Sequence, residues 1–196
     1  MIDDKLYKII RPLLTFLFKL LFHPKIIGKK NIPNNTKAVL AGNHTNILDP
    51  ILLLSATKRS IHFLAKDELI NGKCQFIFKH MGIIPVNRRQ KDHGALENAI
   101  KSLQNDQIIG IFPEGTINRT DDIIMPFKYG AVKMAQATNS PLIPFTIKGK
   151  YKIFGPSVTL TFGKPYYIKE NLSEAKQILE TKIINMLKKE GHYGNH

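Results

Sequence analysis

The 196-residue chain is long enough for one domain with a sizeable core, and 43% of its residues are hydrophobic, as in globular proteins. Its 29 Lys and Arg outnumber its 15 Asp and Glu, and the formal charge of +14 implies an anionic partner or surface. The single cysteine excludes an intramolecular disulfide and a cysteine-rich metal site. No zinc-finger or RNA-binding signature is visible, so we expect an anionic membrane and not nucleic acid as the partner.

The N-terminal segment, residues 6–22, is apolar nearly throughout but contains Lys8, Arg11 and Lys19. Its longest uncharged run, residues 12–18, is far shorter than the roughly 18 to 20 residues that a membrane-spanning helix needs. We therefore expect residues 1–24 to form an amphipathic helix on the membrane surface, followed by one domain over residues 25–196. The alternative is a helix that packs on the core of the domain itself.

Strands and helices are predicted to alternate along the rest of the chain. After a loop-rich connector with room for a short strand at residues 26–27, strands are predicted over residues 39–41, 60–65, 82–89, 107–111 and 141–147. Helices are predicted over residues 49–58, 75–81, 94–104 and 129–138, and a last helix, capped by Ser173, over residues 172–189. One or two antiparallel edge strands are predicted within residues 151–162. This pattern indicates an α/β fold, with a mixed, largely parallel sheet flanked by helices.

A polar segment between two apolar runs, residues 43–50, contains His44 and Asp49. A histidine can take and return a proton near neutral pH, and a carboxylate on its far nitrogen would orient the ring. Residues five apart meet neither on a regular helix nor on a strand, so a strand–turn–helix bend at Gly42 is required to bring them together. The alternative is that Asn and Asp only cap a helix here and that His44 is an ordinary structural residue.

Further polar residues follow three later strands. Lys66 lies just past one predicted strand, and Arg88 and Arg89 end the next, where guanidinium groups can bind a phosphate. The segment Phe112-Pro113-Glu114-Gly115-Thr116 predicts a tight bend that brings a carboxylate and backbone N–H groups to the edge where His44 lies. Each of these segments also has an ordinary reading as a turn or a solvated basic loop.

Four segments together resemble the PlsC-like family of lysophosphatidic acid and glycerol-phosphate acyltransferases. Asn43-His44 with Asp49 resembles the family's His-x4-Asp motif, residues 82–88 its second block ending in Arg, residues 112–116 its third, and residues 141–145 its fourth. The resemblance covers about residues 32–163 and implies the glycerolphosphate acyltransferase-like fold. It also implies transfer of a fatty acyl group from acyl-CoA or acyl carrier protein to the free hydroxyl of 1-acyl-glycerol-3-phosphate, giving phosphatidic acid.

The resemblance assigns roles to particular residues. His44 would be the general base, oriented by Asp49, and Lys66, Arg88, Glu114, Gly115, Thr116 and Arg119 would line the acceptor site. No metal and no cofactor are expected beyond the acyl donor, and the enzyme would work at the cytoplasmic face of the cell membrane as a peripheral or monotopic protein.

The chain departs from the family pattern at Ile117, where the third block usually has Arg; Arg119 or Arg89 would then replace that contact. The departure leaves another lysolipid or hydroxyl acceptor as an alternative. A non-catalytic protein that binds anionic lipid is the second alternative.

Overall fold

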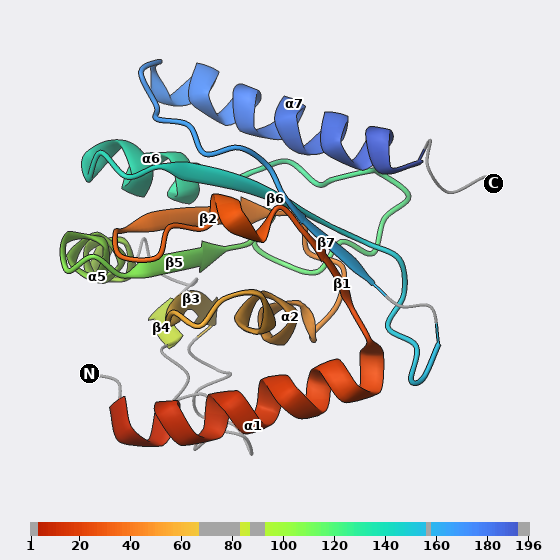
Figure 1. Cartoon of the computed structure of the whole chain (residues 1–196). Coiled ribbons are helices and arrows are strands. Elements are labelled where there is room, and N and C mark those ends of the chain that lie inside the picture. Colours follow the sequence, from red (N-terminus) through yellow and green to blue (C-terminus); the bar gives the residue numbers. More distant parts are fainter. Residues whose placement is uncertain (1–3, 67–82, 87–92, 156–157, 192–196) are drawn as a thin grey trace.

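Seven short apolar segments of the chain form one sheet in the computed structural model, which describes residues 4–66, 83–86, 93–155 and 158–191 (Figure 1). The strand order is β1-β7-β6-β2-β5-β3-β4. Neighbouring strands are parallel, except that β7 runs antiparallel to β6. The strands are β1 (Lys25–Ile27), β2 (Ala38–Gly42), β3 (Ile61–Lys66), β4 (Ile83–Val86), β5 (Ile108–Ile111), β6 (Leu142–Lys148) and β7 (Thr159–Phe162).

Alternate side chains of the central strands enter two separate hydrophobic clusters, one on each face of the sheet. In β2, Ala38 and Leu40 belong to the first cluster, whereas Val39 and Ala41 belong to the second. This alternation is the period-2 pattern of a strand that is covered on both faces. The mixed, largely parallel sheet flanked by helices that the sequence predicts is thereby confirmed.

Helices cover both faces, with α1 below the sheet and α7 above it in Figure 1. The first cluster lies between the sheet and the helices α1 (Asp4–Phe22) and α2 (Asp49–Ala56). The second cluster lies between the opposite face of the sheet and the helices α5 (His93–Gln104), α6 (Gly130–Ala137) and α7 (Leu172–Gly191). A 3-10 turn, η1 (Lys29–Asn31), follows β1.

Two expectations about chain ends and edges need correction. Asn171, and not Ser173, caps α7, because the Asn171 Oδ1 accepts hydrogen bonds from the backbone N–H groups of Ser173 (3.1 Å) and Glu174 (3.0 Å). Within the described part of residues 151–162, β7 is the one strand, and it runs antiparallel to β6 as predicted, but it is not an edge strand, because β1 pairs with its outer side in parallel. The helix predicted over residues 75–81 lies outside the described residues.

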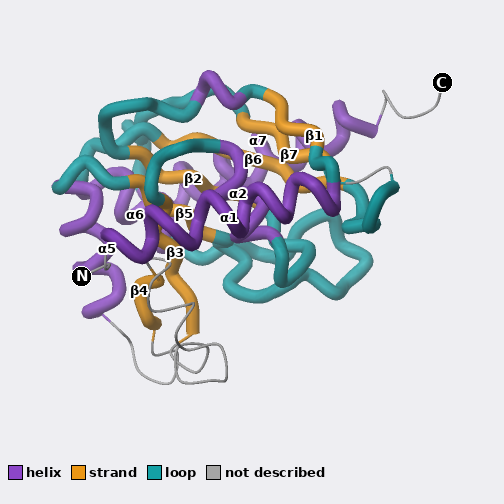
Figure 2. The backbone as a smooth tube through the Cα atoms, turned by 60° about the horizontal axis from the view of Figure 1, so that its bottom comes forward, coloured by secondary structure: helices purple, strands orange, loops and turns teal. Residues whose placement is uncertain are grey.

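Helix α1 has two apolar sides. Tyr7 and Phe18 are buried in the first cluster, which supports the prediction's alternative of a helix packed on the domain core. Four other large side chains of the same helix are exposed: Leu13, Phe16, Leu17 and Leu20. Figure 2 brings this helix to the front, where it crosses the molecule beside α2. None of the helices within the described ranges combines the length and the apolar run needed to cross a bilayer.

Candidate active site

The candidate site lies at the carboxyl ends of β2 and β5, which are neighbouring parallel strands of the sheet. His44 follows β2, and Glu114 follows β5. The carboxyl ends of parallel strands meet at one edge, where open α/β sheets bind their ligands. The edge predicted from the sequence is therefore the one at which these two residues come together.

His44 and Asp49 form a direct pair, with 2.8 Å between the His44 Nδ1 and the Asp49 Oδ2. The Asp49 side chain is fully buried, whereas 16% of the His44 side chain is exposed. The bend between strand and helix starts at Gly42, where a Cβ atom would lie 2.3 Å from the Phe145 side chain, so only glycine fits. The bend that the sequence requires is present, and it brings the His44 ring and the Asp49 carboxylate together.

The Asp49 carboxylate is held by a full set of donors. Its Oδ2 accepts hydrogen bonds from the backbone N–H groups of Thr45 (2.6 Å) and Asn46 (2.8 Å) in addition to the His44 ring. Its Oδ1 accepts the Tyr151 hydroxyl at 2.6 Å. Such a network stabilises a buried, ionised carboxylate, and this carboxylate fixes the His44 tautomer that has its proton on Nδ1. The lone pair of His44 Nε2 is then available to accept a proton.

Glu114 supports the His44 backbone. Its Oε1 accepts the His44 N–H at 2.8 Å and its Oε2 accepts the Met125 N–H at 2.8 Å. Burial raises the pKa of Glu114, although these two hydrogen bonds favour the ionised form. The next residue, Gly115, has φ +78°, a left-handed conformation that other residues rarely adopt. The tight bend predicted at residues 112–116 is thus built around a carboxylate that holds the His44 backbone in place.

The His44 ring also rests on Phe112, with ring centroids 4.1 Å apart and an interplanar angle of 19°. On the other side of the turn, the Asn118 N–H donates to the His44 carbonyl oxygen at 2.8 Å. The residues on either side of Glu114 therefore both contact His44, Phe112 through its side chain and Asn118 through its backbone.

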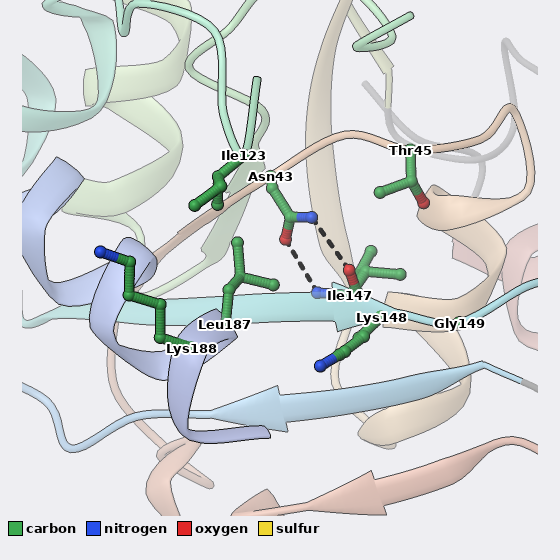
Figure 3. A pocket seen from close by; sticks show the side chains of 8 residues that line it. All are labelled: Asn43, Thr45, Ile123, Ile147, Lys148, Gly149, Leu187 and Lys188. Atoms are coloured by element: carbon green, nitrogen blue, oxygen red, sulfur yellow. Dashed lines mark hydrogen bonds between the residues drawn. The ribbon is translucent and has the colours of Figure 1, made fainter. Parts of the chain in front are cut away.

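A cavity of about 350 Å³ lies beside the His44 turn (Figure 3). Asn43 borders it, and its side-chain amide pairs with the backbone of Ile147 through two hydrogen bonds of 2.9 and 2.8 Å, which extends the contact between β2 and β6. The other lining residues are mainly apolar, with two lysines: Thr45, Ile123, Ile147, Lys148, Gly149, Leu187 and Lys188. An apolar cavity with cationic residues at its border suits part of an amphiphilic anion.

The remaining predicted site residues are placed less completely. Lys66 is the last residue of β3, which neighbours β5, so its backbone lies at the same edge of the sheet. Thr116 and Arg119 are exposed on the segment that follows Glu114. Arg88 and Arg89 lie outside the described residues.

Sequence reasoning did not find Tyr151 or Phe112 as members of this site. Tyr151 is 102 residues from the carboxylate that it contacts, so no local spacing connects the two. Phe112 belongs to the third block, and an aromatic residue directly before the turn is the signal that would have pointed to it.

Comparisons with known proteins agree with this geometry. A family model described as Acyltransferase matches residues 23–148, which contain His44, Asp49 and Glu114. The chain belongs to the acyltransferase family. The family predicted from the four sequence blocks is therefore confirmed.

Relatives of this chain include two bacterial proteins named 1-acyl-sn-glycerol-3-phosphate acyltransferase. The protein from Borreliella burgdorferi is 34% identical over 146 residues, which are 73% of this chain and 58% of the relative. The protein from Bacillus subtilis is 33% identical over 146 residues, which are 74% of this chain and 72% of the relative. The chain thus spans less than two thirds of the first relative and more than two thirds of the second.

The fold of the chain also matches a solved structure. The crystal structure of the 1-acyl-sn-glycerophosphate acyltransferase PlsC from Thermotoga maritima aligns with a TM-score of 0.79. The alignment covers 100% of this chain and 86% of the other, at 22% sequence identity. The predicted glycerolphosphate acyltransferase-like fold is confirmed by this match.

Proposed function

We propose that this acyltransferase moves a fatty acyl group from a thioester, acyl-CoA or acyl carrier protein, to the free hydroxyl of 1-acyl-glycerol-3-phosphate, giving phosphatidic acid. The observation that carries the proposal is the His44–Asp49 pair at the strand ends of a chain in this family. The names of the two bacterial relatives support the choice of acceptor.

In the proposed reaction, His44 Nε2 removes the proton from the acceptor hydroxyl while that oxygen attacks the thioester carbonyl carbon. Asp49 stabilises the imidazolium that forms, as the carboxylate of a Ser-His-Asp triad does. The tetrahedral intermediate then expels the thiolate, which takes the proton back from His44. The ester and the free thiol are the products, so no proton is gained or lost overall.

The acceptor phosphate is proposed to bind beside the turn at residues 112–116. Lys66, Arg88 and Arg119 would supply positive charge, and the backbone N–H of Thr116 would act as a hydrogen-bond donor beside Gly115, whose own N–H closes the turn on the Phe112 carbonyl oxygen at 2.9 Å. Glu114 would contribute by holding the turn against His44, because both its oxygens accept backbone N–H groups.

The first experiment measures transfer of labelled acyl groups from acyl-CoA and from acyl carrier protein to 1-acyl-glycerol-3-phosphate in vesicles. We expect product from the wild-type protein and none from a folded His44→Ala variant. Equal turnover by His44→Ala would overturn the proposed role of the histidine.

A different acceptor is the second candidate, because Ile117 stands where the family usually has Arg. The same assay with a series of lysolipids that differ in headgroup distinguishes the two. A higher kcat/KM for a lysolipid without a terminal phosphate would support the second candidate, because the missing guanidinium would matter less for it.

We also propose that α1 lies on an anionic membrane surface, at the cytoplasmic face, with the protein peripheral or monotopic. The exposed apolar side chains of α1 support this placement: Leu13, Phe16, Leu17 and Leu20. The loop after β6 adds two more exposed apolar residues, Ile153 and Phe154, and 72% of Phe154 is exposed. The Phe154 N–H donates to the Leu21 carbonyl oxygen at 2.9 Å, so the loop and the helix lie side by side.

The net charge of +14 favours anionic lipid over neutral lipid. Sedimentation with vesicles tests this proposal. We expect binding to phosphatidylglycerol vesicles that Phe16→Ser with Leu20→Glu weakens, while Tyr167→Ser, an exposed aromatic residue before α7, leaves binding unchanged. Equal binding of both variants would contradict the placement of α1 on the membrane.

A further inference from the structure

The two oxygens of the Asp49 carboxylate have different partners. Oδ2 accepts the His44 ring and two backbone N–H groups of the same turn, all from within five residues of Asp49. Oδ1 accepts the Tyr151 hydroxyl at 2.6 Å, and the Thr45 hydroxyl is a longer contact at 3.3 Å. The shorter bond to Oδ1 therefore comes from a distant part of the chain.

The Tyr151 ring lies between this carboxylate and helix α1. Its ring centroid is 5.7 Å from that of Phe22 at an interplanar angle of 89°, and 6.1 Å from that of Phe18 at 66°, both edge-to-face arrangements. Phe18 is buried with only 4% of its surface exposed. Burial and the charge of Asp49 raise the pKa of Tyr151, so its hydroxyl stays protonated and donates to the carboxylate.

Helix α1 also holds the other end of the helix that Asp49 begins. The Arg11 guanidinium donates to the carbonyl oxygens of Leu54 (2.9 Å), Thr57 and Lys58 (3.1 Å), which cap the C-terminal end of α2. Both ends of α2 are therefore tied to α1, one directly through Arg11 and one through the aromatic contacts of Tyr151.

We propose that Tyr151 is a positioning residue for the His44–Asp49 pair and that it transmits the packing of α1 to the Asp49 carboxylate. The inference rests on the proposed function, in which Asp49 orients His44. The hydrogen bond of Tyr151 is made to Asp49 Oδ1, the oxygen that faces away from the His44 ring bond at Oδ2. Tyr151 fixes the rotation of the Asp49 carboxylate. The carboxylate in turn fixes the orientation of the His44 imidazole, whose Nε2 takes the proton from the substrate hydroxyl.

Tyr151→Phe tests this role, because it removes the hydroxyl and keeps the ring that packs on α1. In detergent micelles we expect kcat to fall about tenfold, while KM for the acyl donor and for the lysolipid changes by less than about twofold. Tyr167→Phe, which removes a hydroxyl from an exposed ring, is the matched control and should keep the wild-type kcat.

A spectroscopic measurement separates positioning from a general structural effect. In NMR spectra of ¹⁵N-histidine-labelled protein, we expect the His44 Nδ1–H resonance to shift or broaden in Tyr151→Phe and to stay in place in Tyr167→Phe. An unchanged resonance together with wild-type kcat in Tyr151→Phe would overturn the inference.

The contribution of α1 is tested with Phe22→Leu, which removes the edge-to-face contact and keeps an apolar side chain. We expect a smaller loss of kcat than in Tyr151→Phe and no further loss when the two changes are combined. Losses that multiply in the double variant would show that α1 does not act through Tyr151.

His44→Ala, measured in the same assay, separates the two proposals. If it stays active, the proposed function fails and the role of Tyr151 fails with it. If His44→Ala is inactive while Tyr151→Phe behaves as wild type in rate and spectrum, only the inference about Tyr151 fails.

Discussion

Replacing Asp49 with Asn removes the negative charge beside His44 while keeping the size of the side chain. The amide oxygen can occupy the Oδ2 position, where His44 and the backbone N–H groups of Thr45 and Asn46 donate. The amide N–H2 group then faces Tyr151, whose hydroxyl oxygen can accept a hydrogen bond as well as donate one. We therefore expect Asp49→Asn to fold with the His44 tautomer intact.

The loss of activity in Asp49→Asn is then mainly electrostatic. The imidazolium and the carboxylate have charge centres about 4 Å apart, and at an effective dielectric constant of about 20 their attraction is about 4 kcal/mol. The imidazolium exists only when the proton has been transferred, so most of this energy is lost from the transition state. A loss of about 4 kcal/mol corresponds to a decrease of about 10³-fold in kcat.

The assay is steady-state acyl transfer at saturating donor and acceptor, with circular dichroism and thermal unfolding to confirm that Asp49→Asn is folded. A kcat within about threefold of wild type, with His44→Ala inactive, would refute the reasoning. It would mean that Asp49 orients the histidine without stabilising the imidazolium.

Three further predictions concern residues around the pair. Gly115→Ala should lower the free energy of unfolding, measured by chemical denaturation, by about 1 kcal/mol because Gly115 has a positive φ. The Lys128 amine, which a Cβ would meet at 2.8 Å, can move away, so the cost comes from the backbone conformation. Gly155→Ala is the control and should be nearly neutral. Because the pKa of Glu114 is raised, the folded state binds the Glu114 proton more tightly than the unfolded state does. The stability of the wild type relative to Glu114→Gln should therefore be greatest at low pH and fall as pH rises through that pKa, which urea titrations of the two proteins in parallel would measure. Arg11→Ala should lower the free energy of unfolding, measured by thermal unfolding, by about 1.5 to 3 kcal/mol, because carbonyl groups at the C-terminal end of α2 lose their donor. Arg11→Lys should recover only part of this loss, because an ammonium lacks the planar arrangement of donors of a guanidinium. Equal stability of the three proteins would contradict the capping role.

The parts of the site that lie close together in the sequence could be predicted from it. His44 and Asp49 share one short polar segment between apolar runs, and Gly42 marks the bend that joins them. Pro113 and Gly115 predict the tight bend that brings Glu114 to the same edge as His44. These predictions needed only strand polarity and turn chemistry, which are local properties of the chain.

The contacts that the sequence did not predict are those made across the fold. The bond between Tyr151 and Asp49 depends on how the chain leaves β6 and returns beneath the sheet, which no spacing encodes. The inward side of α1 was hidden for another reason. Apolar residues form one broad, continuous arc around this amphipathic helix, so Tyr7 and Phe18 could not be separated from outward residues such as Phe16 by pattern alone.

The two apolar sides of α1 limit how this protein can be prepared without detergent. Deleting the helix would uncover the cluster that receives Tyr7 and Phe18 and would remove the Arg11 cap of α2, so the shortened chain should aggregate and lose activity. Polar replacements confined to the outward residues would instead leave the core, the cap and the Tyr151 contact unchanged. A water-soluble form suited to crystallisation should therefore keep the full length of α1 and replace only the apolar residues on its outward surface.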